Sequence, residues 1–167
     1  MKNFLNFLII FLIATLQITL LKKFAFGGVT FNLSLILVVL WSILLERKAL
    51  FWILLLGILL DLNSLTFFGL YTLGFLVIFI LALFSKKLIG EVNYFSASIS
   101  VFVLTLIFDL IFLLGLKIGG FQIPPLDYFS KLILPEAIYN TLVSFPFFFL
   151  FSKYANFFKE ETTLPVK

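Results

Sequence analysis

Charged residues in this 167-residue chain occur in short clusters, and the stretches between these clusters are almost wholly apolar. A helix that crosses a bilayer needs about 20 predominantly apolar residues. The longest stretch, Ala49–Ser85, contains 37 residues and would extend about 55 Å as a single helix at about 1.5 Å per residue. Because the hydrocarbon core of a bilayer is only about 30 Å thick, this stretch is predicted to fold back as a hairpin of two helices.

The same reasoning divides the whole chain into six apolar segments. We therefore predict an all-α fold, a polytopic membrane helix bundle with about six transmembrane helices. Residues 1–151 are predicted to form a single transmembrane helical domain, and residues 152–167 a polar cytoplasmic tail. The first apolar run is long for a signal peptide, so an uncleaved first helix is favoured. The predicted helices are Phe4–Leu21, Val29–Leu45, two helices within Ala49–Ser85 joined by a turn at residues 61–64, Tyr94–Leu116 and Leu132–Phe151.

The composition supports a membrane protein and argues against an enzyme. Hydrophobic residues make up 63% of the chain, charged residues only 12%, and the mean hydropathy is +1.24. There is no cysteine and no histidine, which removes disulfides, thiol chemistry and the usual zinc and haem ligands. We expect no catalytic residue, no metal and no cofactor. No basic run exceeds two residues, so nucleic acid is not an expected partner.

The basic residues predict the orientation in the membrane. Cytoplasmic loops of membrane proteins carry an excess of Lys and Arg. If the first helix starts in the cytoplasm, eight basic residues fall on the cytoplasmic side and four fall outside. We therefore expect a multi-pass protein with both termini in the cytoplasm. Trp41 and Trp52 lie on either side of the charged cluster Glu46–Lys48 and are expected to anchor their helices at the membrane surface.

Three acidic residues within the apolar segments are candidates for function, because ionisable groups inside a membrane are costly. Asp61 lies near the outer end of the third predicted helix; it is either a contact to another helix or a partner, or a turn residue among the headgroups. Asp109 lies about 10 Å below the outer end of the fifth helix by helical rise, so it is expected to face the bundle interior. Glu136 follows Pro135, a helix-start signature, and Asn140 lies four residues later on the same helix face.

Other small and polar residues predict where helices approach closely. Gln17 in the first helix is costly unless it is hydrogen-bonded. All three acidic candidates fall in the outer half of the predicted bundle, and the inner halves of the helices contain no acid, which argues against a transport path. The small residues around the third, fourth and fifth helices are Gly57, Gly69, Gly74, Ser96 and Ser100.

Four segments of the chain, in their order and spacing, resemble the family of the rod shape-determining protein MreD. The first contains Gln17 and the second starts at Asn32, where Phe31 departs from the family, which often has Pro before the Asn. The third contains Asp61, and the fourth opens the last helix. The resemblance covers most of the chain. The segments are Leu16–Thr19, Asn32–Val39, Gly57–Leu62 with Phe68–Leu73, and Pro135–Asn140.

The resemblance implies a non-catalytic scaffold of the bacterial cell-elongation machinery, located in the inner membrane and helping to maintain rod shape and organise peptidoglycan synthesis. MreC is the implied direct partner, and MreB and the peptidoglycan synthases are indirect partners; the resemblance leaves room for a homo-oligomer. Residue pattern and resemblance together single out a set of intramembrane polar or partner-binding residues. This set is Gln17, Asn32, Asp61, Asp109, Glu136 and Asn140.

The family's helical bundle is similar to the substrate-binding subunits of energy-coupling-factor vitamin transporters, and this similarity supplies an alternative. The chain would then be a substrate-binding membrane subunit of a small-molecule transporter. Such a subunit would have a ligand pocket at its outer face and an Ala-x-x-x-Ala motif on its first helix. This chain has Ala14 in the first helix but Ile18 at the matching position, which favours the scaffold.

Overall fold

The structure is a computed structural model that describes the backbone of residues 2–19, 28–64, 68–90 and 92–160, and the side chains of residues 6–19, 28–64, 68–90 and 92–153. The described residues form an all-α fold, as predicted. A 3₁₀ turn, η2 (Glu46–Ala49), and a π-helical segment, η3 (Phe129–Ile133), connect α-helices directly. The α-helices are α1 (Lys2–Thr19), α2 (Leu33–Leu45), α3 (Leu50–Asn63), α4 (Leu70–Ile89), α5 (Tyr94–Ile118), α6 (Pro125–Tyr128) and α7 (Leu134–Glu160).

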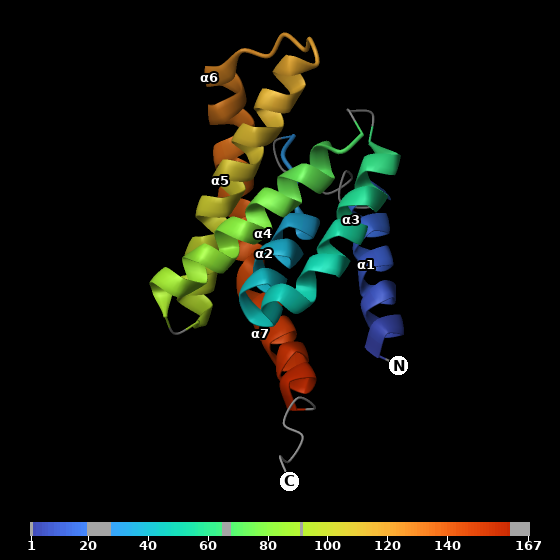
Figure 1. Cartoon of the computed structure of the whole chain (residues 1–167). Helices are drawn as coiled ribbons and strands as arrows, with labels where there is room; N and C mark the ends of the chain where they lie inside the picture. Colours follow the sequence, from blue (N-terminus) through green and yellow to red (C-terminus); the bar gives the residue numbers. More distant parts are fainter. Residues whose placement is uncertain (1, 20–27, 65–67, 91, 161–167) are drawn as a thin grey trace.

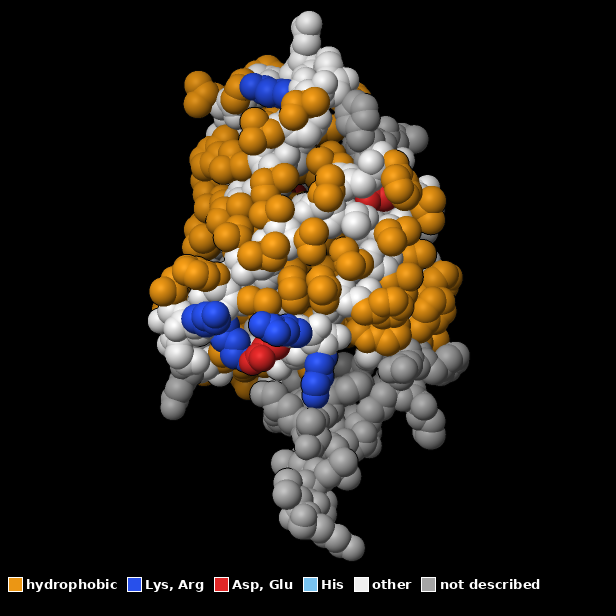
Figure 2. Space-filling model, viewed as in Figure 1, with side chains coloured by type: hydrophobic (Ala, Val, Ile, Leu, Met, Phe, Trp, Pro, Cys, Tyr) orange, Lys and Arg blue, Asp and Glu red, His pale blue; other side chains and the backbone are white. Residues whose placement is uncertain are grey.

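Successive long helices run in alternating directions, as Figure 1 shows. The start of α1, the α2–α3 turn, the α4–α5 connection and the end of α7 lie toward one end, called here the lower end as in Figure 1. The α3–α4 and α5–α6 connections lie at the opposite, upper end. This alternation is the order of directions that the sequence predicts. Figure 2 shows Lys and Arg side chains gathered at the lower end and an apolar surface above them.

Helix α2 is the centre of the bundle, with α1, α3, α4, α5 and α7 packed against it. Every residue from Leu33 to Ile43 is buried. The helix has 13 residues and spans about 20 Å at about 1.5 Å per residue, less than the about 30 Å hydrocarbon core. It begins at Leu33 rather than at Val29, because the Asn32 side chain caps it there. The second predicted span is therefore a short core helix that neighbouring helices shield from lipid.

Among the described residues, three helices are long and apolar enough to cross a membrane. They are α4, α5 and the continuous helix Pro125–Lys153, which comprises α6, η3 and the first part of α7. Their outward faces carry large apolar side chains such as Leu73 and Phe84 on α4 and Leu114 on α5, all more than half exposed. Three long apolar helices indicate a helical, multi-pass membrane protein, and the six predicted spans are not confirmed among the described residues.

Two further expectations differ from the structure. The last helix continues to Glu160, beyond the predicted end at Phe151, so the first part of the predicted polar tail is helical. Trp41 is a core residue and not the predicted surface anchor, since it is only 1% exposed and its ring meets that of Phe151 edge-on, with centroids 6.4 Å apart. Its place in the sequence, next to a charged turn, fits an anchor equally well, and only the packing of α7 against α2 shows that it belongs to the core.

Glycines allow the closest helix contacts. A Cβ on Gly57 of α3 would lie 2.7 Å from the Thr72 Cα of α4, and a Cβ on Gly74 of α4 would lie 2.8 Å from the Phe108 ring of α5. Both distances are shorter than real Cβ contacts, so these two glycines permit close packing, as predicted. Gly69 has another role, because its φ of 101° places it in the left-handed region at the start of α4.

Candidate functional site

The first turn of α2 is buried, so its backbone N–H groups need partners from within the protein. Three polar side chains supply them. The Asn32 Oδ1 accepts from the Leu35 N–H at 3.0 Å, as an ordinary N-cap does. The Gln17 Oε1 of α1 accepts from the Leu33 N–H at 2.9 Å. The Asn140 Oδ1 of α7 accepts from the Asn32 N–H at 2.6 Å. Helices α1 and α7 therefore cap α2 in addition to its own N-cap residue.

The other half of the Asn140 amide joins α7 to α5. Its Nδ2 donates to the Thr105 Oγ1 at 3.2 Å, and that hydroxyl donates to the Val101 carbonyl within α5. One turn further along α7, the Ser144 hydroxyl is hydrogen-bonded to the Ser98 hydroxyl of α5 at 3.0 Å. Asn140, Thr105 and Ser144 are all 0% exposed. These bonds fix how α5 and α7 are rotated against each other, because the buried groups have no water molecules as alternative hydrogen-bond partners.

Two carboxyl groups lie beside this network. Glu136, half-buried on α7, lies beside Asn32 and Asn140 and interacts with both side chains. Asp109 of α5 is 8% exposed, so it faces the bundle interior as predicted. It interacts electrostatically with Glu136, and its Oδ2 has no hydrogen-bond partner among the described residues. The ion pairs that the described residues form involve neither group. This pair concentrates acidic character inside the bundle without a basic counterpart.

Asp61 caps a second helix, α4. Its Oδ1 accepts from the Tyr71 N–H at 2.9 Å, and its Oδ2 accepts from the Thr72 N–H at 3.0 Å and the Thr72 hydroxyl at 2.6 Å. The side chain is buried, at 4% exposed. A carboxylate at the start of a helix is favourable because the free N–H groups and the helix dipole are both positive there. Of the two interpretations of Asp61, contact with another helix is the one that the structure supports.

The cap on α4 leads into an aromatic cluster between α4 and α5. The Tyr71 ring lies 5.0 Å from the Phe112 ring between centroids, and the Phe75 and Phe108 rings are stacked at 5.3 Å. Tyr71 also interacts electrostatically with Asp61, Asp109 and Glu136. The cluster thus places the Asp61 cap and the carboxyl pair on neighbouring parts of one packed region.

The predicted polar residues fall into two groups in the structure. Gln17, Asn32, Glu136 and Asn140 meet at the start of α2, with Asp109 beside them, while Asp61 holds the start of α4. Sequence reasoning missed the partners Thr72, Ser98, Thr105 and Ser144. The spacing of Ser98 and Thr105, seven residues apart on α5, is a signal that they share one face with each other.

The arrangement contains hydrogen-bonding and packing groups, and no described set of three or more His, Cys, Asp or Glu side chains is placed to hold a metal ion. What it does chemically is to satisfy buried backbone donors and to lock helices α1, α2, α5 and α7 together. Comparison of the chain with family models, with curated proteins and with solved structures gives no match.

Proposed function

We propose that this chain is a non-catalytic, multi-pass membrane scaffold of the bacterial cell-elongation machinery, with MreC as its direct partner. The proposal rests on the resemblance to the MreD family together with one observation. The segments that carry the resemblance contain the side chains that cap α2 and α4, so each segment has a structural role in the bundle.

The contacts between these segments support the proposal. Gln17 of the first segment and Asn140 of the fourth both bind the backbone at Asn32–Leu33, where the second segment starts. Asn140 and Asn32 are separated by 108 positions in the chain. Within the third segment, Asp61 binds Thr72, and Gly57 allows the close approach of the same residue. Three of the four segments thus meet at the start of α2, and the third segment holds α3 against α4. Chance similarity between apolar stretches gives no reason for these contacts to coincide with the matching segments.

In this proposal the polar residues build the platform, and the partner binds its surface. Asn140 is fully buried, so it does not contact MreC directly; Glu136 is half-buried and has an accessible part. Binding of MreC organises MreB and the peptidoglycan synthases indirectly. The protein lies in the cytoplasmic membrane with both termini in the cytoplasm, which places the basic lower end of the bundle on the cytoplasmic side.

The transporter alternative makes a different prediction about partners. A substrate-binding subunit would co-purify with an ATPase module or a bound vitamin. At the upper end, a hollow of about 610 Å³ is lined by the segment from Lys117 to Pro124. The lining residues come from a single connection, so this hollow gives no specific support for a ligand site between helices.

Co-purification tests the proposal. The tagged chain is expressed in a rod-shaped bacterium depleted of its own MreD and purified from native membranes. We expect MreC to co-purify and rod shape to return. Glu136→Gln keeps hydrogen-bonding capacity but loses the charge, so it should lower MreC recovery several-fold if Glu136 touches the partner. Recovery of an ATPase module without MreC would overturn the scaffold and favour the transporter. Unchanged recovery with Glu136→Gln would remove only Glu136 from the contact.

A further inference from the structure

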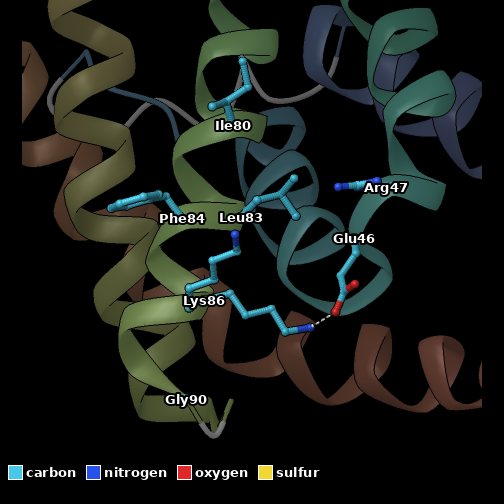
Figure 3. A pocket seen from close by; sticks show the side chains of 8 residues that line it. Glu46, Arg47, Ile80, Leu83, Phe84, Lys86 and Gly90 are labelled. Carbon is cyan, nitrogen blue, oxygen red and sulfur yellow. Dashed lines mark hydrogen bonds and ion pairs between the residues drawn. The ribbon is translucent and has the colours of Figure 1, made fainter.

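A groove opens at the lower end of the bundle, between the α2–α3 turn and the last turns of α4 (Figure 3). It has a volume of about 550 Å³. Its lining is charged at the α2–α3 turn and at the last turn of α4, and apolar along the preceding turns of α4. Its lining includes the cations Arg47, Lys86 and Lys87 and the apolar Ile80, Leu83 and Phe84.

The charges in the groove do not balance. The Lys86 Nζ donates to the Glu46 Oε1 at 2.6 Å and to the Ile43 carbonyl at 2.8 Å, so this lysine is neutralised and held in place. The side chains of Arg47 and Lys87 are both exposed and form no hydrogen bond or ion pair with the described residues. Figure 3 shows the Arg47 guanidinium directed from the turn toward Leu83 on α4. The groove therefore offers two uncompensated cations to an anion.

The apolar wall of the groove continues into the membrane-facing surface. Ile80 and Phe84 lie four residues apart on α4, on one face, and are 57% and 63% exposed. Helix α4 is one of the three candidate membrane spans. Ile80 lies about 10 Å from Lys87 along the helix axis by helical rise. An occupant that satisfies both parts of the groove must therefore be an anion attached to an apolar chain about 10 Å or more in length.

We propose that this groove binds the headgroup phosphate of an anionic phospholipid, with one acyl chain along Ile80 and Phe84. Basic pockets between membrane helices are suited to anionic headgroups, and a guanidinium can bind two phosphate oxygens at once. A free phosphate ion would use the cations but would leave the exposed apolar wall without an occupant. Glu46 sets the affinity, because it cancels the charge of Lys86.

Native mass spectrometry of the full purified chain tests the site, with phosphatidylglycerol and phosphatidylcholine as the two titrated lipids. We expect phosphatidylglycerol to bind more tightly. The double variant Arg47→Gln/Lys87→Gln should lower its affinity about 25-fold, since each of the two cations near anionic lipid contributes a factor of about five. The matched control Lys117→Gln/Lys131→Gln removes the same charge at the upper end and should change nothing. Glu46→Gln frees the Lys86 charge and should raise the affinity.

Three results would overturn the proposal. Equal losses in the groove variant and the upper-end control would mean that net charge, and not the groove, attracts the lipid. Equal affinity for the two lipids would show that the uncompensated cations do not select a headgroup with net negative charge. Displacement of the lipid by glycerol 3-phosphate at similar concentration would assign the groove to a soluble phosphate. Helix content measured by circular dichroism confirms that each variant is folded, which is expected because Arg47 and Lys87 are exposed.

Discussion

At the scale of single residues, Asn140 joins three helices through one amide. Its oxygen accepts from the backbone of Asn32 and its nitrogen donates to Thr105, and the side chain is 0% exposed. A buried donor that loses its partner keeps the full cost of its desolvation. In a bilayer the cost falls on the protein alone, because no water replaces the lost partner. The amide therefore contributes more through the groups it satisfies than through its own burial.

Replacing Asn140 by Leu should destabilise the bundle, because the Asn32 N–H would lose its acceptor. We expect the free energy of unfolding in detergent micelles to fall by about 1–3 kcal/mol, measured by titration with sodium dodecyl sulfate. Thr141→Val is the control, since the Thr141 hydroxyl donates to the Ala137 carbonyl of its own helix and to no other described residue. If both variants lose the same stability, the cap from α7 to α2 is not what the Asn140 amide contributes.

The polar residues of this site are visible in the sequence, but their pairing is not. Gln17 and Asn140 stand out because an amide in an apolar segment needs a partner. Choosing that partner requires the rotation of each helix about its axis, and apolar segments of this kind give little periodicity from which to infer it. The role of Thr105 was not predictable for a different reason. A hydroxyl can donate to a carbonyl of its own helix, as Thr105 does, so its presence in an apolar segment does not indicate a partner on another helix.

At the scale of helices, an all-apolar segment has two physical explanations that sequence does not separate. A helix surrounded by lipid and a helix surrounded by other helices are both apolar on every side. Helix α2 is surrounded by other helices. Its length of 13 residues follows from the cap at Asn32, which sets where the helix begins. Ser34 and Ser42, both 0% exposed, are the residues in it that least suit lipid. The directions and order of the helices were predictable because charged turns separate them.

The contact of α3 with α4 should depend on Gly57. Gly57→Ala places a methyl group 2.7 Å from the Thr72 Cα, a backbone atom that cannot move without shifting the residue that Asp61 holds. We expect a loss of about 1–3 kcal/mol in the free energy of unfolding, the usual cost of overpacking. Ile58→Ala is the comparison, since Ile58 is 40% exposed and removing its bulk creates no clash. A Gly57→Ala protein as stable as the parent would show that α3 and α4 are not this close.

At the scale of the whole molecule, the two ends of the bundle differ in chemistry. The upper end holds the caps of α2 and α4 and the acidic pair, while the lower end carries the basic turn and the lipid groove. This division follows from the order of charged and apolar segments along the chain. The charge bias of the lower end is the reason for placing it in the cytoplasm.

Cysteine labelling tests both the division into ends and its orientation, and the chain contains no cysteine that would give background. Asn63 is the last residue of α3, and Gln122 lies in the α5–α6 connection. Both side chains are exposed, and both elements end at the upper end of the bundle. Asn63→Cys and Gln122→Cys should therefore react alike with a membrane-impermeant maleimide. Lys87→Cys, at the lower end, should behave in the opposite way. If the basic lower end is cytoplasmic, the two upper positions react in intact cells and Lys87→Cys reacts only after permeabilisation. The reverse pattern would invert the orientation but keep the fold, whereas different behaviour of Asn63→Cys and Gln122→Cys would contradict the alternating order of the helices itself.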